Sequence, residues 1–364
     1  MRVDRLRLSG YRNISLLDLS LSGGVTLLVG DNAQGKTNLL EAVLVMTLGR
    51  SHRTQKERDL VQQGCDQAVI RVDIARRDGA HALRMVIPAQ GPRSLRIDGA
   101  QARSVGEMMG RLNAVLFSPE DLRVVKDGPD VRRRFLNREI SQLKPAYFGV
   151  LQRYARALRQ RQVALRDAAL HGTLDAWDEQ LALEGCAMIR LRHAVLSELA
   201  TRCAAWHDRL CEGSETLAIE YRPSIQAETP SEYMSRLTTR RMQDIAQKQT
   251  ALGPHRDDVA MLIDGRDARL FASQGQQRTA ALALRLAEVE LIHEMTGEAP
   301  VLMLDDVFSE LDARRRALLL GSIDGAQTLI TCTDLHEALR AGDADGLRQA
   351  RVLRVARGEF TYDG

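Results

Sequence analysis

Cysteine and aromatic residues are scarce in this sequence, and their distribution excludes several classes of protein. The five cysteines are scattered without CxxC or Cys/His ligand spacing, so neither a disulfide framework nor a zinc site is expected. A reducing cytoplasm is the simplest compartment for such a chain. Aromatic residues make up only 4% of the sequence, which leaves few side chains for stacking on unpaired bases.

Long apolar runs are also missing. No run approaches the roughly twenty apolar residues that cross a membrane, and residues 1–6 lack the uninterrupted apolar core of a signal peptide. We therefore expect a soluble, cytoplasmic protein with no membrane partner. A sustained heptad pattern is absent as well, which disfavours a long coiled-coil arm.

A phosphate-binding loop is present. Residues 30–37 fit GxxxxGK[ST], between an apolar strand predicted at 25–29 and a helix predicted at 38–48. In such a loop backbone N–H groups converge on an anion, the lysine neutralises phosphate oxygens, and the threonine hydroxyl can hold Mg²⁺. The flanking strand and helix argue against a purely conformational glycine turn. We expect ATP and Mg²⁺ to be held by Gly30, Asp31, Asn32, Ala33, Gln34, Gly35, Lys36 and Thr37, with Lys36 also acting in catalysis.

Two aspartates follow a second apolar run. Residues 301–304 predict a short strand at the centre of a parallel sheet, and Asp305 and Asp306 come directly after it. We predict Asp305 as the partner of Thr37 at Mg²⁺, and Asp306 as the group that orients or deprotonates the attacking water. Taken alone the pair could be a strand end or a helix cap, but the phosphate loop favours the functional interpretation.

A third motif, residues 273–278, precedes a helix predicted at 277–294. A serine hydroxyl and a glycine at a helix N-terminus make an anion site, and here they are Ser273 and Gly275. We do not expect one subunit to bring this site and the phosphate loop to the same phosphate, whereas a head-to-tail dimer can. The simpler interpretation is a helix N-cap with Gln276 at the capping-box position, and the two interpretations are compatible.

The chain length suggests about two domains. Strands with Asp-Gly turns fill the first hundred residues, whereas about 130–211 is rich in Arg, Ala, Leu and Glu and has helical periodicity over 174–210. Strand character returns near residue 250, with strands predicted at 259–263 and 269–272. Because the nucleotide motifs flank the helical segment, we predict an ATPase lobe of residues 1–115 plus 297–364 and a mainly helical lobe of residues 116–296.

The predicted helical lobe contains a basic stretch. Nine basic residues lie between Val131 and Gln162, against one acid, Glu139. Such an excess can meet a polyanion, or it can be a solvated helix face. Contact with the backbone of duplex DNA would be salt-dependent and indifferent to sequence. The candidate phosphate contacts are Arg132, Arg133, Arg134, Arg153, Arg156 and Arg159.

Together these motifs resemble the ABC-type ATPase heads shared with SMC proteins, and more narrowly the RecF family of bacterial DNA replication and repair proteins. The marks of that family run from the first strand almost to the end of the chain. The resemblance implies an α/β fold, a two-lobed ABC-type/SMC-like P-loop ATPase head with an inserted helical lobe. The residues that carry the resemblance are 10–13, 37–42, 117–122, 132–136, 253–258, 273–278 and 305–312.

The resemblance also implies a function and further site residues. The implied protein binds DNA in an ATP-dependent way, dimerises on nucleotide at gapped or duplex DNA, and assists loading of the RecA recombinase with RecO and RecR. By position, Arg12, Asn13 and Asn38 would lie near the nucleotide, and Ser273, Gly275 and Gln276 would meet it from the other subunit. Ser309 with Asp312 would communicate across the dimer, and the turn at 118–120 would stand in place of a Gln loop.

Some positions depart from the wider pattern. Ala33 stands where many phosphate loops have glycine, and we expect no cost if its torsions are ordinary. Asp306 and Thr333 stand where transport ATPases carry Glu and a switch His, which predicts slow hydrolysis. His255 is interpreted as structural or DNA-facing rather than as a catalytic base.

Three other P-loop classes remain as alternatives. A P-loop kinase would use Lys36 and Asp305 but would need no 273–278 motif. A transporter ATPase is disfavoured by the large helical insertion, and an SMC-like architectural protein would need heptad arms.

Overall fold

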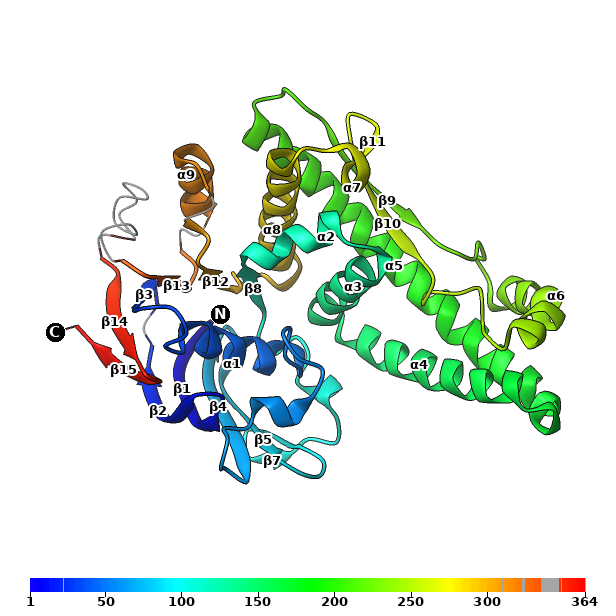
Figure 1. The fold of residues 1–364 in the computed structure, drawn as a ribbon, viewed down its shortest axis with the longest axis horizontal. Coiled ribbons are helices and arrows are strands. Elements are labelled where there is room, and N and C mark those ends of the chain that lie inside the picture. Colours follow the sequence, from blue (N-terminus) through cyan, green and yellow to red (C-terminus); the bar gives the residue numbers. More distant parts are fainter. Residues whose placement is uncertain (22, 309–310, 323–324, 335–346, 348, 364) are drawn as a thin grey trace. The chain divides into compact units, whose positions relative to one another are not determined.

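The computed structural model describes residues 1–21, 23–308, 311–322, 325–334, 347 and 349–363 of the chain (Figure 1). The chain forms two compact units, Met1–Asp121 with Leu282–Gly364, and Leu122–Ala281. These boundaries differ from the predicted 115/116 and 296/297. The difference arises because Arg285, within helix α8 (Gln274–Thr296), donates to Asp121 at 2.7 Å, so the turn before residue 122 and most of α8 belong to the first unit.

The first unit contains a mostly parallel sheet in the order β15-β14-β3-β13-β12-β8. Its central strands are continuous buried runs, as expected for parallel strands covered on both faces. Strand β13 lies between β3, which leads to the phosphate loop, and β12, which ends at Asp305. The strands are β3 (Val25–Val29), β8 (Ala114–Phe117), β12 (Val301–Asp305), β13 (Thr328–Cys332), β14 (Arg351–Ala356) and β15 (Glu359–Tyr362).

A second sheet of this unit is antiparallel, in the order β2-β1-β4-β5-β6-β7. Buried and exposed residues alternate along β4 and β5, because one face of each strand meets the core. The side chain of Gln327 joins the two sheets, since it accepts from Val3 N at 2.7 Å and donates to Val3 O at 2.8 Å. The strands are β1 (Arg2–Tyr11), β2 (Ile14–Ser20), β4 (Gln67–Arg76), β5 (Gly79–Pro88), β6 (Ser94–Ile97) and β7 (Ala100–Gln101).

Helix α1 (Lys36–Leu48) fills the space between the two sheets. It contacts β4 of the antiparallel sheet and β8, β12 and β13 of the parallel sheet. Eleven of its thirteen residues are buried, as expected for a helix that is apolar nearly all round. The N-terminus of α1 is therefore held rigidly at the end of β3.

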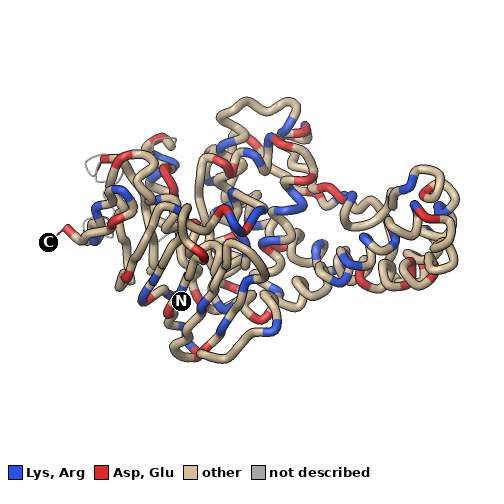
Figure 2. Tube along the Cα trace, turned by 60° about the horizontal axis from the view of Figure 1, so that its bottom comes forward, with Lys and Arg blue, Asp and Glu red and all other residues tan. Residues whose placement is uncertain are grey.

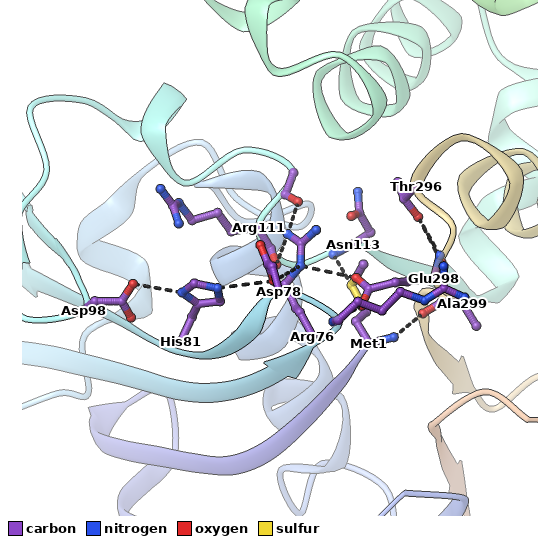
Figure 3. A network of polar contacts seen from close by, with 12 residues as sticks. Met1, Arg76, Asp78, His81, Asp98, Arg111, Asn113, Thr296, Glu298 and Ala299 are labelled. Carbon is purple, nitrogen blue, oxygen red and sulfur yellow. Dashed lines mark hydrogen bonds and ion pairs between the residues drawn. The ribbon is translucent and has the colours of Figure 1, made fainter.

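A polar network ties the antiparallel sheet to the segment before β12 (Figure 3). Arg76, at the end of β4, lies 3.3 Å from the buried carboxylate of Glu298 and donates to the carbonyl oxygens of Gly110 and Arg111. On the neighbouring strand β5, His81 shares a hydrogen bond of 2.9 Å with Asp98, and this bond raises the pKa of His81. This network therefore fixes the start of β12, the strand that ends at Asp305.

The second unit is mainly helical, as predicted, and includes a small antiparallel sheet in the order β11-β10-β9. Helices α4 and α5 are joined by a short 3₁₀ segment and pack against each other, and α6 packs on α5. At 1.5 Å per residue, the 38-residue α5 is about 57 Å long. The elements are α2 (Leu122–Lys126), α3 (Pro129–Leu143), α4 (Pro145–Arg166), α5 (Leu174–Cys211), β9 (Leu217–Arg222), α6 (Pro230–Gln247), β10 (Asp258–Ile263), β11 (Arg266–Asp267) and α7 (Ala268–Phe271).

The predicted strand at 269–272 was wrong. Residues 268–271 form the short helix α7, in which Asp267 accepts from Arg269 N at 2.9 Å as an N-cap. Strand β10 pairs with β9 on one side, and on the other side with only the two residues of β11. Within the described ranges, no helix is both long and apolar enough to pass through a bilayer.

Residues 253–258 organise the core of the second unit. Asp257 is buried and accepts from Arg192 at 2.8 Å, from Ser224 N at 2.8 Å and from the Tyr221 hydroxyl. This one carboxylate therefore joins α5, β9 and the loop before β10.

His255 belongs to the same core. Its Nδ1 lies 2.7 Å from the Tyr154 hydroxyl and its Nε2 lies 3.0 Å from Thr250 O. Burial lowers the pKa of His255 to about 4, so the ring is neutral near pH 7. A neutral ring with both nitrogens bonded has a structural role.

Candidate nucleotide site

The phosphate loop lies between β3 and α1, where the sequence predicted it. Lys36 is 7% exposed, and its Nζ donates to the carbonyl oxygens of Gly30 and Asp31, the latter at 3.1 Å. Its ammonium group is therefore held inside the loop.

Asp305 and Thr37 meet although they are 268 residues apart. Thr37 Oγ1 donates to Asp305 Oδ1 at 2.9 Å, which brings the end of β12 to the first turn of α1. A hydroxyl and a carboxylate are oxygen donors of the kind that Mg²⁺ prefers, and Mg²⁺ usually completes its shell with water and phosphate oxygens. Among the described residues, no cluster of three or more His, Cys, Asp and Glu side chains offers an all-protein metal cage.

The sequence interpretation missed Thr331, which supports both aspartates. Thr331 Oγ1 donates to Asp305 Oδ1 at 2.8 Å and accepts from Asp306 N at 3.0 Å. Thr331 is buried near the end of β13, the strand between β3 and β12. No local motif marks this threonine, since its role follows from the order of strands in the sheet.

Asp306 is exposed and has a left-handed backbone conformation, with φ of 54°. Such torsions are uncommon outside glycine, although aspartate tolerates them better than most residues. The role of Asp306 with the attacking water remains a prediction.

Ala33 does not have ordinary torsions, because its φ is 64°. We expected no conformational cost for alanine here only if its torsions were ordinary, and the structure does not meet that condition. A left-handed alanine costs about 1–2 kcal/mol, which surrounding contacts must offset.

Arg12 lies at the β1–β2 turn, and its guanidinium group is already bonded within the chain. It donates to both carboxylate oxygens of Glu41, at 2.8 and 2.7 Å, and to Asp59 O at 2.8 Å. Burial would raise the pKa of Glu41, but hydrogen bonds from Arg12 and Ser51 outweigh burial and lower it. Arg12 therefore shapes the surroundings of α1 in this structure. The buried partner Glu41 was not predicted.

Ser273 and Gln276 form the predicted capping box at the start of α8. Gln276 N donates to Ser273 Oγ at 3.2 Å, and Ser273 N donates to Gln276 Oε1 at 2.7 Å. Ser273, Gln274 and Gly275 are exposed. The N-cap interpretation is thus confirmed, while the contact of Ser273 and Gly275 with nucleotide stays a prediction.

The segments predicted to communicate between sites are only partly described. Ser309 lies outside the described residues. Asp312 caps α9 (Ala313–Ser322), because its Oδ1 accepts from Arg315 N at 2.8 Å. In the turn at 118–120, Ser118 N donates to Asp121 at 2.8 Å.

Three of the six arginines proposed for DNA are engaged in ion pairs. Arg132 is buried and bonds both carboxylate oxygens of Asp258, at 2.8 and 3.0 Å, so we reassign it as a structural residue. Arg133 donates to Asp130 and to Asp257 O, and Arg153 bonds Glu184 at 2.5 and 3.0 Å. The sequence could not reveal the pairing of Arg132, because its partner lies 126 residues away.

The other three, Arg134, Arg156 and Arg159, are exposed, and no ion pair is found for them among the described residues. Arg156 and Arg159 share one face of α4 with the exposed Arg166, at positions i, i+3 and i+10. Elsewhere, Lys and Arg are interspersed with Asp and Glu over both units (Figure 2). The α4 face is therefore the clearest cationic surface among the predicted residues.

Comparison with known proteins agrees with this architecture. The family model described as "RecF/RecN/SMC N terminal domain" matches residues 2–350. The DNA replication and repair protein RecF of Lachnoclostridium phytofermentans is 42% identical over 98% of this chain and 99% of its own length. RecF of Symbiobacterium thermophilum is 40% identical over 100% of this chain and 99% of its own length.

Solved structures agree as well. The recombination mediator protein RecF with ATPrS, of the RecFOR pathway, superimposes with a TM-score of 0.89 at 33% identity, covering 100% of this chain and 98% of that chain. The Smc head domain of Pyrococcus furiosus, at 15% identity, covers 99% of this chain and 95% of that chain with a TM-score of 0.56, which supports the fold alone.

These matches decide against the kinase and transporter alternatives and confirm the predicted fold class. The chain belongs to the RecF family of DNA replication and repair proteins, within the wider group of SMC-like ATPase heads.

Proposed function

We propose that this protein binds ATP and Mg²⁺ at the phosphate loop and uses slow hydrolysis as a switch for a DNA-bound dimer in recombinational repair. The observation that carries the proposal is the contact of Thr37 with Asp305 at 2.9 Å, beside a buried Lys36. That pairing of a loop threonine with a strand-end carboxylate is how P-loop folds hold Mg²⁺. The relatives solved with ATP and ATPrS support the choice of nucleotide.

In this proposal each residue of the nucleotide site has a separate role. Lys36 and the loop N–H groups bind the phosphates, and Thr37 with Asp305 would hold Mg²⁺, which supplies charge neutralisation at the phosphates when bound. Asp306 orients or deprotonates the attacking water. A rate below the enzyme median of about 10 per second is expected, since Asp306 is shorter than the Glu of transport ATPases.

A second copy of the chain completes the site in this proposal. Ser273 and Gly275 are exposed and lie at the start of α8, and the N-terminus of a helix favours an anion. They would bind the γ-phosphate held by Lys36 of the other copy. Dimerisation would then require ATP.

DNA contact is assigned to the exposed arginines for which no ion pair is found among the described residues. Arg134, Arg156 and Arg159 would meet the phosphate backbone of duplex or gapped DNA without reading sequence. The recombination-mediator relatives of the RecFOR pathway also support RecO and RecR as partners. In this proposal RecA is the protein finally loaded.

Sedimentation with and without ATP, in the presence and absence of gapped DNA, tests the proposal. We expect a monomer without nucleotide and a dimer with ATP, and Ser273→Arg should abolish the dimer while leaving ATP binding intact. A monomer under all conditions would refute the switch.

Fluorescence anisotropy with duplex DNA tests the DNA surface. Replacing Arg134, Arg156 and Arg159 with Ala should weaken binding and flatten its salt dependence, since each phosphate contact adds about 0.9 to the slope. The matched control is Arg202→Ala, an arginine of α5 engaged with Glu198 in its own helix. Equal DNA affinity for the triple variant and the control would remove the assignment.

A further inference from the structure

The C-terminal hairpin β14–β15 meets the phosphate loop at two points, although more than 300 residues separate them in sequence. We infer that this hairpin, together with Asn13, braces the phosphate loop, and that Gln34 and Gly358 are positioning residues for nucleotide binding. This role depends on the proposed ATP site and specifies what holds its loop in shape.

The first point of contact is Gly30, at the start of the loop. Strand β14 runs parallel to β3, with Arg354 opposite Val29, and continues past the strand end. A Cβ atom on Gly30 would overlap the carbonyl oxygen of Val355. The hairpin therefore lies directly against the loop where it leaves the sheet.

The second point of contact is Gln34, in the middle of the loop. Arg357 and Gly358 form the two-residue turn between β14 and β15, with φ of 50° and 81°, as in a tight hairpin turn. Both backbone N–H groups of this turn donate to Gln34. Arg357 N bonds Gln34 Oε1 at 2.6 Å, and Gly358 N bonds Gln34 O at 2.8 Å.

Asn13 holds the same carbonyl from the β1–β2 turn. Asn13 Nδ2 donates to Gln34 O at 3.1 Å, and Asn13 Oδ1 accepts from Asn38 of helix α1 at 2.8 Å. Arg53 in turn donates to Asn38 at 2.8 Å, so the chain of hydrogen bonds continues beyond the loop. The Gln34 carbonyl thus has two donors, one from each hairpin turn.

Fixing this carbonyl also fixes a donor to the phosphates. The C=O of Gln34 and the N–H of Gly35 belong to one planar peptide, so the direction of one sets the direction of the other. Loop N–H groups of this kind bind the phosphates of a nucleotide. The turn must approach closely to do this, because a Cβ on Gly358 would overlap Asn13 O.

Gly358→Ala tests the brace, and Gly99→Ala is its matched control. Gly99 is the second residue of an equivalent turn, with φ of 51° at Asp98 and 84° at Gly99, but a Cβ there meets nothing within 4 Å. Both variants carry a similar torsional penalty, but only in Gly358→Ala does the new Cβ overlap a neighbour, Asn13 O of the β1–β2 turn, so only this variant must shift the two turns that hold Gln34. We expect Gly358→Ala to raise the Kd for ATP about tenfold or more and Gly99→Ala to leave it unchanged, with both variants folded by circular dichroism.

Hydrogen exchange without nucleotide separates failure of the brace from failure of the proposed function. Amides of residues 31–36 should exchange faster in Gly358→Ala than in Gly99→Ala, whether or not ATP binds. Gln34→Ala, which removes the acceptor for Arg357 N, should act in the same direction. Equal exchange in the two glycine variants, or equal Kd values where the wild type binds ATP, would overturn the brace. Absence of ATP binding by the wild type would overturn the proposed function instead.

Discussion

Replacement of Thr331 with Val should slow ATP hydrolysis much more than it weakens ATP binding. The Thr331 hydroxyl bonds both Asp305 Oδ1, at 2.8 Å, and Asp306 N, at 3.0 Å. Valine has almost the same shape, so the packing of β13 is kept while both hydrogen bonds are lost. Among the described residues, no hydrogen bond joins this hydroxyl to the phosphate loop.

The size of the effect follows from the bonds removed. A hydrogen bond to an ionised carboxylate contributes about 1.5–3 kcal/mol, and an ordinary hydrogen bond such as that to Asp306 N contributes about 0.5–1.5 kcal/mol. If about 1.4 kcal/mol of this lost stabilisation raises the activation free energy of hydrolysis, kcat falls about tenfold. The Kd for ATP should change less than about threefold, or about 0.6 kcal/mol, because Lys36 and the loop amides remain.

A coupled ATPase assay and nucleotide titration on the same preparations measure the two quantities. The control is Thr328→Val in the same strand, since the Thr328 hydroxyl donates only locally, to Ala326 O at 3.3 Å. A kcat for Thr331→Val equal to that of Thr328→Val would refute the claim that Thr331 positions the aspartates.

Two further predictions concern the second unit. Arg132→Ala should lower the free energy of unfolding by about 2–4 kcal/mol in urea titrations, because it removes three charge-assisted hydrogen bonds of a buried group, two to Asp258 and one to Asp127 O. Arg134→Ala should stay within about 0.5 kcal/mol of wild type. Equal stabilities would return Arg132 to the list of DNA contacts. His255 binds protons in the unfolded chain near pH 6.5 but, with its pKa lowered to about 4, not in the folded one. Stability should therefore be complete above pH 6.5 and fall by up to about 3 kcal/mol as the pH drops to 4. His255→Gln should flatten that slope, and an unchanged slope would show that another group titrates.

The local parts of the nucleotide site were predictable from the sequence. The spacing of residues 30–37 and the apolar run before Asp305 each specify a short structure and its chemistry, and the structure brings Thr37 and Asp305 together. Helical periodicity likewise predicted α5 to within a residue at each end.

The supporting residues were not predictable, because their roles arise from strand order and distant pairing. Thr331 acts because β13 lies between β3 and β12, and Gly358 acts because β14 lies beside β3. Arg132 and Arg134 look alike in a basic run, yet Asp258 buries only the first of them. Periodicity can assign a residue to a helix but cannot say which distant carboxylate faces it.

The central claim, that each nucleotide is held by two copies of the chain, is tested most directly by mixing two inactive variants. Lys36→Ala cannot hold the phosphates in its own loop, and Ser273→Arg cannot bind the γ-phosphate held by the other copy. If the site is shared, a mixed dimer contains one intact site, whereas a dimer of either variant with itself would contain none. Mixing should therefore restore up to about half of the wild-type ATPase activity in a twofold dimer. No recovery on mixing, with both variants folded, would contradict the account.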